Sequence, residues 1–229
     1  VSTPKQWQSC YAEMQLELSY RKSVKVKEKL AGLSAWLRAG ELQASKTETA
    51  EFNPKLFHDV LLEIKKLTTQ DPSDFQPQLQ ELCARAGVFY LLIPEIPGQG
   101  ISGVMRWFHK RPIIQQTLLH KTNDQFWFTF FHEAKHVLQN RKKSIFLEGE
   151  KANETREREA NRFASDLLID PSAWTAFLSQ GNFADKDVIH FATSQKIHPG
   201  IVSGRLLREK KIQYYDAAAK LRDSFSWSR

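Results

Sequence analysis

The sequence predicts an α+β fold, in which a small β-sheet lies beside a long aromatic helix and a helical segment precedes both. Apolar residues at helical spacing dominate the two ends of the chain, and short β-rich runs gather near its middle. The run FWFTFFHEAKHVLQ follows those runs without a Gly or Pro, so it predicts a single helix. With 229 residues, the chain is long enough to bury a sizeable core.

The N-terminal third of the chain is predicted to be helical. Leucines recur at spacings of three and four within residues 5–39. A second helix is expected from Asn53 to Leu67, because Asn53 is a favourable N-cap and Pro54 suits the first helical position.

The run TTQDPSDFQPQ, residues 68–78, is rich in turn-forming residues. The hydrophobic periodicity changes after it. We therefore expect the main boundary of the chain here, between a helical N-terminal segment or connector, residues 1–72, and a second domain, residues 73–229.

Three β-type runs follow a short helix that ends at Gly87. They are VFYLLIP from Val88, VMRWF from Val104 and PIIQQTLL from Pro112, and the run EIPGQGISG is predicted to be a loop between the first two. SIFLEG, residues 144–149, is expected to form another short strand.

The remainder of the chain is predicted to be helical from Asn153 onward. Breaks are expected near Pro171, Gly181 and Pro199. The chain shows no internal repeat and no low-complexity tract.

The composition excludes several classes of protein. The formal net charge is +7, but the basic residues are dispersed among acidic ones, which favours solvated helix surfaces over a dedicated nucleic-acid surface. No run approaches the ~20 apolar residues of a membrane span, and the N-terminus lacks a secretory signal pattern. Cys10 and Cys83 form no CxxC pair, so we expect neither a disulfide framework nor a cysteine-bound metal, and we expect a reducing cytoplasm.

The aromatic helix, expected from Asn123 to Asn140, has two sides of different chemistry. At about 100° per residue, its large apolar residues fall on one broad side, namely Phe126, Trp127, Phe130, Phe131, Ala134, Val137 and Leu138. His132 and His136 fall on the other side, and Glu133 lies at the border. The histidine pair is therefore expected to face away from the core that the aromatic side buries.

The spacing of His132, Glu133 and His136 matches the metallopeptidase pattern HExxH. Two histidines one helical turn apart can bind a single zinc ion through imidazole nitrogens, and the Glu between them can hold a water that the metal polarises. Four other histidines have no ligand-like spacing to a partner, so we interpret them as surface or core residues: His58, His109, His120 and His190.

A catalytic zinc ion needs a third protein ligand, which must come from outside this helix. The segment ETREREANRFASDLL, residues 154–168, is predicted to be a helix whose buried stripe is flanked on opposite sides by Glu157 and Glu159. Helical periodicity alone does not choose between these two carboxylates, and Glu154 lies farther from the stripe.

Three motifs of the chain resemble the ImmA/IrrE family of zinc-dependent metallopeptidases. KTNDQFWFTFFHEAKHVL is similar to the active-site helix of that family, EREANRFASDLLID to its second signature, and IHPGIVSGRL to a C-terminal signature. The resemblance extends from about Leu79 to Lys211. It implies a zincin-like metallopeptidase core, with a small β-sheet beside the HExxH helix.

The resemblance also implies a role for each site residue. His132 and His136 are then metal ligands, Glu133 is the general base, and Glu159 is the third ligand. His198, in the C-terminal signature, is a candidate for stabilising the tetrahedral oxyanion, although an ordinary capping or packing histidine would occupy the same sequence context. Zn²⁺ is the expected metal, and this donor set also suits Mn²⁺ or Fe²⁺.

Two features depart from the family pattern. Lys135 stands where the family often has a small residue, and we expect its long side chain to extend into solvent. Members of the regulator subtype commonly carry an N-terminal helix-turn-helix domain that binds DNA, but the chain begins with Val1 and contains no complete domain of that kind. We expect that domain to have been removed, so that contact with DNA is indirect.

Two functions from different classes fit these observations. The first is a zinc endopeptidase that cleaves a DNA-binding repressor or an antitoxin, with an edge strand that holds the substrate extended. The second is a metal-binding sensor or interaction module of a transcriptional regulator or antitoxin, which cleaves nothing. The intact HExxH favours the first function, and the joint order of the motifs disfavours an accidental match in a helical domain.

Overall fold

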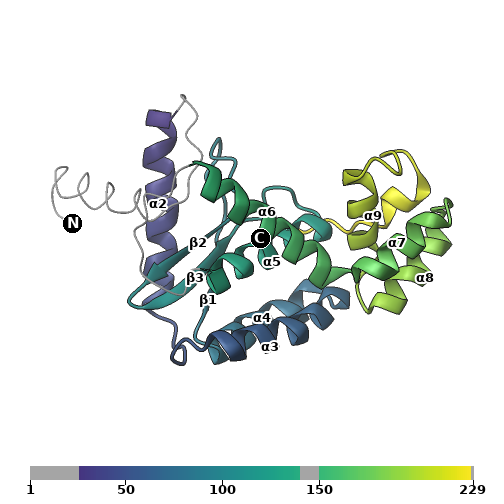
Figure 1. Cartoon of the computed structure of the whole chain (residues 1–229). Coiled ribbons are helices and arrows are strands. Elements are labelled where there is room, and N and C mark those ends of the chain that lie inside the picture. Colours follow the sequence, from purple (N-terminus) through teal and green to yellow (C-terminus); the bar gives the residue numbers. More distant parts are fainter. Residues whose placement is uncertain (1–25, 140–149, 228–229) are drawn as a thin grey trace.

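The computed structural model describes residues 26–139 and 150–227, which form a mixed α+β molecule with a small sheet (Figure 1). The elements in chain order are α2 (Val26–Ala44), α3 (Pro54–Lys66), the 3₁₀ turn η1 (Leu67–Thr69), α4 (Pro72–Arg85), β1 (Phe89–Leu92), β2 (Gly103–Phe108), β3 (Arg111–Gln116), α5 (Asn123–Gln139), α6 (Glu150–Leu168), α7 (Pro171–Ser179), α8 (Asp185–Gln195), α9 (Pro199–Arg208) and the 3₁₀ turn η2 (Ala217–Leu221).

The N-terminal helices agree with the sequence where the structure describes them. The Asn53 side chain accepts hydrogen bonds from the backbone N–H groups of Lys55 and Leu56, and Pro54 opens α3, as predicted. The helix expected over residues 5–39 is described from Val26 and continues to Ala44.

The turn-rich run at residues 68–78 is the start of a helix. Pro72 occupies the first helical position of α4, where a missing N–H costs nothing, and Pro77 lies inside the helix. Phe75 of α4 belongs to the same core cluster as Phe57 of α3 and Trp127 of α5. Residues 72–78 are therefore helical although they are rich in turn formers, and buried side chains from both sides of residue 72 share one core.

The predicted β-type runs form a three-stranded sheet in the order β1-β3-β2. β1 pairs with β3 in parallel, with Phe89 opposite Ile113, whereas β2 pairs with β3 in antiparallel register, with Met105 opposite Ile114. β2 and β3 form a hairpin, and within the described sheet β2 lies at an edge.

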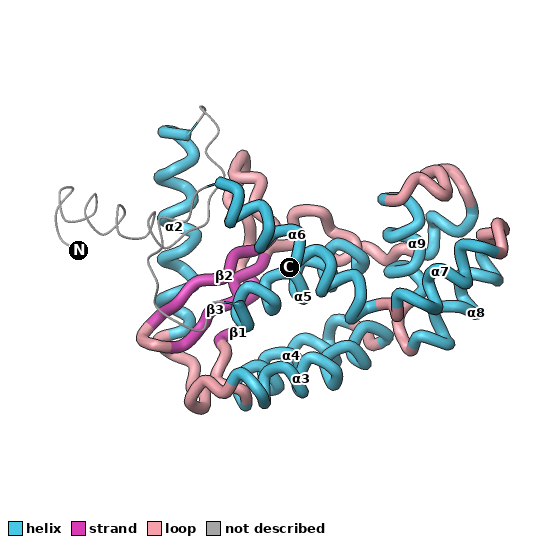
Figure 2. Tube along the Cα trace, viewed as in Figure 1, coloured by secondary structure: helices cyan, strands magenta, loops and turns pink. Residues whose placement is uncertain are grey.

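The two faces of the sheet pack against different helices (Figure 2). Because side chains alternate along a strand, Phe89 and Leu91 contact α2 on one face, while Tyr90 points into the core on the opposite face. That larger core contains buried side chains of α3, α4 and α5. The sheet is thus a middle layer, and α5 is held against it by the larger core.

The C-terminal helices α7, α8 and α9 gather at the end of the molecule away from the sheet (Figure 1). The helix breaks fall at Pro171 and Pro199, as predicted, and residue 181 lies between α7 and α8. After η2 the chain returns to the start of α5, where Ser224 bridges to Thr122. The start of α5 is therefore in contact with the C-terminal segment of the described chain.

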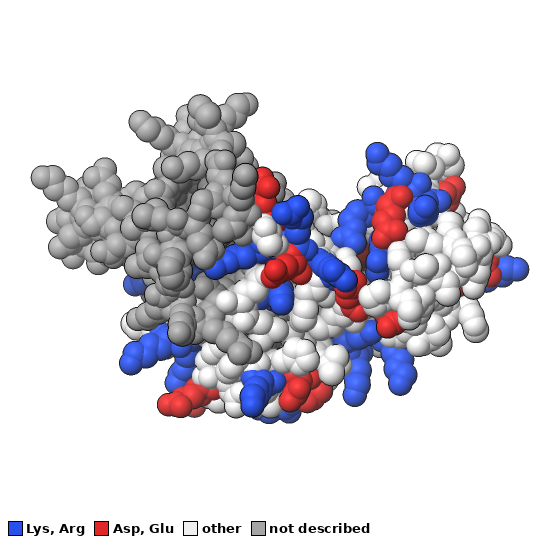
Figure 3. All heavy atoms as spheres, viewed as in Figure 1, with Lys and Arg blue, Asp and Glu red and all other residues white. Residues whose placement is uncertain are grey.

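Opposite charges are mixed on one face of the molecule, and Cys83 is buried. On the face shown in Figure 3, Lys and Arg side chains lie among Asp and Glu side chains. Cys83 is a free, buried thiol. In the part of the chain that the structure describes, no helix has the length and apolar character needed to cross a bilayer. The strand expected at residues 144–149 lies outside the described residues.

Candidate metal centre

Helix α5 presents the histidine pair because its other side is anchored in the core. It runs from Asn123 to Gln139, within one residue of the predicted bounds, and its buried apolar residues are Phe126, Trp127, Phe130, Phe131, Ala134 and Val137. The ring of Trp127 lies 4.8 Å from that of Phe75, between ring centres. His132 and His136 are only partly buried and face away from this cluster, as predicted.

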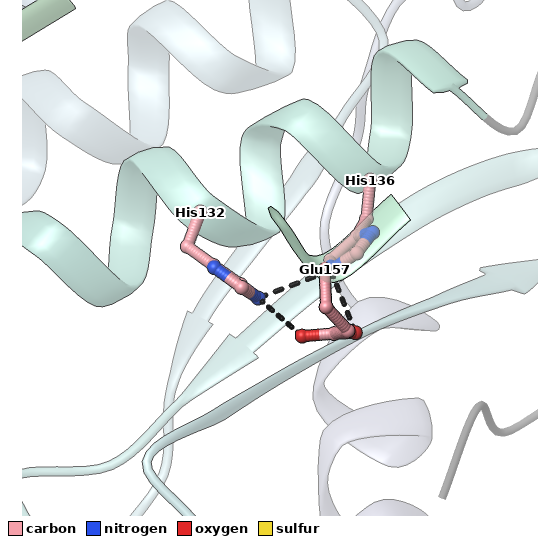
Figure 4. A group of neighbouring side chains, drawn as sticks. All are labelled: His132, His136 and Glu157. Atoms are coloured by element: carbon pink, nitrogen blue, oxygen red, sulfur yellow. Dashed lines mark hydrogen bonds and ion pairs between the residues drawn. The ribbon is translucent and has the colours of Figure 1, made fainter. Parts of the chain in front are cut away.

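Helix α6 brings a carboxylate to the histidine pair (Figure 4). The Nε2 atoms of His132 and His136 are 3.0 Å apart. Each lies 3.3 Å from one oxygen of the Glu157 carboxylate. One ligand atom from each of the three residues lies within 4.8 Å of the other two, which is the spacing that a single metal ion requires.

The carboxylate at this point is that of Glu157, whereas the family resemblance had implied Glu159. Glu159 is exposed, and its carboxylate accepts a hydrogen bond of 2.8 Å from Gln139. Residues two apart on a helix point in different directions, so the two side chains do not reach the same atoms. The structure therefore brings Glu157, and not the expected Glu159, to the histidine pair, and Glu154 is also exposed.

A signal for Glu157 was present in the sequence. Asn161 follows it by one helical turn, so the two side chains lie on the same face of α6. The Oδ1 atom of Asn161 lies 3.0 Å from Nδ1 of His132. A carboxylate and an amide four residues apart, both facing a histidine pair, distinguish Glu157 from Glu159.

The Nδ1 atom of each histidine, on the side of the ring away from Glu157, lies close to an amide oxygen. Nδ1 of His132 faces Asn161, and Nδ1 of His136 lies 3.1 Å from Oε1 of Gln139. An amide oxygen only accepts hydrogen bonds, so both Nδ1 atoms carry the proton in the neutral rings. The two Nε2 atoms are thereby left unprotonated, which is the form that binds a metal.

Glu133 is buried against strand β2. The residue is 8% exposed, and its carboxylate accepts a hydrogen bond from the backbone N–H of Met105. Burial raises the pKa of the Glu133 carboxyl above its usual range, although the neighbouring His136 and His132 oppose the shift. A carboxylate with a raised pKa next to a metal site is suited to accept a proton.

The charges of the cluster favour a cation between the three side chains. When the rings of His132 and His136 carry a second proton, on Nε2, their hydrogen bonds to the Glu157 carboxylate hold its pKa well below its usual range, against the effect of burial. Burial alone would lower the pKa of His132, but the hydrogen bond to Glu157 and the charges of Glu133 and Glu157 raise it. Positive charge at this point is thus stabilised.

His198 lies at the other end of α5, in a capping position. Its Nδ1 accepts a 3.0 Å hydrogen bond from the backbone N–H of Gly200 and lies 2.7 Å from Nδ2 of Asn123. Its Nε2 lies 2.9 Å from the Asp223 carboxylate. Asn123 precedes His132 by nine residues, about 13 Å along the helix axis. These contacts are those of the packing alternative and give no support to the oxyanion role.

A small pocket lies along the first half of α5, on the N-terminal side of the cluster. It has a volume of about 90 Å³ and lies between α5, α6 and α9, where Phe128, Leu168 and Ile201 form part of its wall. Phe128 connects it to the cluster, because its ring centre is 6.3 Å from that of His132.

The remaining predicted residues lie outside the cluster. The ammonium group of Lys135 lies 5.3 Å from the ring centre of Phe163, so it packs on that aromatic face instead of extending freely into solvent. The histidines without ligand-like spacing, which the sequence left as surface or core residues, are all exposed: His58, His109, His120 and His190.

Comparison with protein families gives one match, over residues 118–183, to the IrrE N-terminal-like domain of the Peptidase_M78 family. This segment is therefore similar to that domain. It contains α5 and α6, and with them His132, His136 and Glu157. The resemblance to the ImmA/IrrE family is confirmed over this range, and with it a relation to peptidases. No match to the chain was found among curated proteins or among solved structures.

Proposed function

We propose that the protein is a zinc-dependent endopeptidase of the zincin-like class. The observation that carries the proposal is the convergence of two Nε2 atoms and one carboxylate on a single point. In this proposal His132, His136 and Glu157 are the metal ligands, and Glu133 is the general base.

The donor set is chemically suited to a divalent cation. Two imidazoles and one carboxylate are a common ligand set for catalytic zinc, and they leave a further position open. The hydrogen bonds that Nδ1 of His132 and His136 donate to Asn161 and Gln139 select the metal-binding tautomer of each histidine. The same donors also suit Mn²⁺ or Fe²⁺, so zinc is proposed here on the family relation.

Glu133 supplies the proton chemistry of the proposed reaction. A bound divalent cation would polarise a water molecule and the peptide carbonyl. Glu133 accepts the proton of the attacking water and then delivers it to the nitrogen of the leaving amine. Its burial beside β2 fixes the carboxylate and raises its affinity for that proton.

The substrate is proposed to be a protein segment in an extended conformation. β2 is an edge strand of the described sheet and runs beside Glu133, which packs on Gly103 and meets Met105. An extended peptide can add to such an edge through backbone hydrogen bonds. The pocket beside Phe128 offers room for one of its side chains. By the family resemblance, we propose a DNA-binding repressor or antitoxin as the natural substrate.

The proposal is tested with Glu133→Gln. This variant should keep stoichiometric metal, because Glu133 is not a proposed ligand, and it should lose about 10²- to 10⁴-fold in the rate of peptide cleavage, because the amide accepts no proton. Metal analysis and incubation with candidate repressors from the same genome provide the two measurements, and Glu154→Gln is the matched control on an exposed glutamate.

Unchanged cleavage by a metal-loaded Glu133→Gln protein would overturn the assignment of the base. If the variant instead keeps a full regulatory effect while no form of the protein cleaves a candidate substrate, the chain is a metal-binding interaction module. That result would contradict the peptidase proposal.

A further inference from the structure

Gln139 connects the histidine pair to a second carboxylate of α6. Its Oε1 lies 3.1 Å from Nδ1 of His136, and its Nε2 donates a 2.8 Å hydrogen bond to Oε2 of Glu159. The backbone carbonyl of Arg156 is a weaker acceptor for the same Nε2, at 3.5 Å. Three side chains from two helices thus form a continuous chain of hydrogen bonds that ends on a proposed metal ligand.

The chemistry of the two ends fixes the direction of this chain. A carboxylate only accepts hydrogen bonds, so the NH₂ group of Gln139 must face Glu159. The carbonyl oxygen of the same amide is then turned toward His136. Because that oxygen also only accepts hydrogen bonds, the proton of the neutral imidazole is held on Nδ1, and Nε2 stays unprotonated.

We propose that Glu159 is a positioning residue of the metal centre, acting through Gln139 on His136. The inference rests on the proposed metal site and goes beyond the assignment of its ligands. It gives a role to an exposed carboxylate that contacts neither histidine. An exposed glutamate contributes little to folding, so an effect of its removal on metal binding would come from this chain of hydrogen bonds.

Helix α6 would then control both histidines. Asn161 faces His132 directly, and Glu159 reaches His136 through Gln139. Glu157, between them in the sequence, supplies the proposed ligand itself. A shift of α6 would therefore disturb the ligand and both tautomers together.

Metal affinity provides the first test. Removing the outer partner of a metal-binding histidine typically costs about 10- to 100-fold in affinity. We expect Gln139→Ala to fall in this range and Glu159→Ala to lose about 10-fold, because the Arg156 carbonyl still orients the amide in part. Glu159→Gln, which keeps an acceptor oxygen, should lie between Glu159→Ala and the parent, and Glu154→Ala should match the parent.

A double-mutant cycle distinguishes this chain from a direct role. In the Gln139→Ala background, Glu159→Ala should cause no further loss of Zn²⁺ or Co²⁺ affinity, since its only proposed route to the site is gone. The absorption spectrum of bound Co²⁺ should change in the same way for both single variants. An equal loss in the two backgrounds would overturn the proposal, as would a loss of stoichiometric binding in Glu159→Ala, which would make Glu159 a ligand.

A metal-free measurement separates this inference from the proposed function. ¹H–¹⁵N spectra of the imidazole nitrogens at a pH where His136 is neutral should show the proton on Nδ1 in the parent and less of that form in Gln139→Ala and Glu159→Ala. If the parent binds no metal, the peptidase proposal fails, and these spectra still decide the positioning role. Unchanged tautomers in both variants would overturn it.

Discussion

His198 packs beside the first turn of α5, whereas His132 and His136 lie near the other end of that helix. The two places show how the same type of side chain becomes a helix cap or a candidate metal ligand. Each histidine uses Nδ1 in contact with an amide side chain. At His198 the partners of Nδ1 are N–H donors, from Gly200 and Asn123, so Nδ1 accepts and the proton lies on Nε2. At His132 and His136 the partners are amide oxygens, which place the proton on Nδ1.

The hydrogen-bond partner of Nδ1 decides whether Nε2 donates a hydrogen bond or offers a lone pair to a metal. The protonated Nε2 of His198 is a donor and is directed at Asp223. The unprotonated Nε2 atoms of the pair face one another and the Glu157 carboxylate. Only the second arrangement leaves lone pairs that converge on a cation.

The largest effect is expected from removing the carboxylate of the proposed metal site. Glu157→Ala should abolish stoichiometric zinc binding, because two histidines alone leave too few donors for a tight site. Metal content after dialysis measures this, with Glu154→Ala on the same helix as control. A fully metallated Glu157→Ala protein would show that the cluster is not the metal site.

A smaller effect is expected from adding a methyl group where α9 packs against the first turn of α5. An added Cβ at Gly204 would overlap the Asp124 carboxylate, so α9 depends on this glycine to approach the first turn of α5. Gly204→Ala should lower the free energy of unfolding by about 1 to 3 kcal/mol, as overpacking does. Chemical denaturation measures the change, and metal stoichiometry should stay at the parent value. Unaltered stability would mean that α9 does not pack so closely on α5.

The smallest effect concerns His198 itself. His198→Ala removes the acceptor that caps α9 and should cost about 0.5 to 2 kcal/mol of stability without loss of metal. His198→Asn keeps a capping oxygen and should restore most of the difference. If His198→Ala abolished peptide cleavage in a stable, metal-loaded protein, the oxyanion role would be restored and the comparison between the two ends would fail.

Much of the local structure follows from the sequence. The start of α3 depends on Asn53 and Pro54, and the bounds of α5 depend on an uninterrupted aromatic run, so neighbouring residues decide both. The turn-rich run at residues 68–78 misled because prolines favour turns and first helical positions alike. The packing of Phe75 into the common core resolved that ambiguity in favour of a helix.

The histidine pair at one-turn spacing, the glutamate beside it and the aromatic side that anchors their helix can all be recognised in the sequence. The fold is needed to show that Glu157 lies beside the histidine pair and that His198 lies apart from it. The physical reason is that periodicity fixes the directions of side chains within one helix, whereas the choice of Glu157 over Glu159 depends on how α6 is rotated against α5. For His198 the same holds, because its hydrogen-bond partners come from α5, from its own helix and from the C-terminal segment, which only folding brings together.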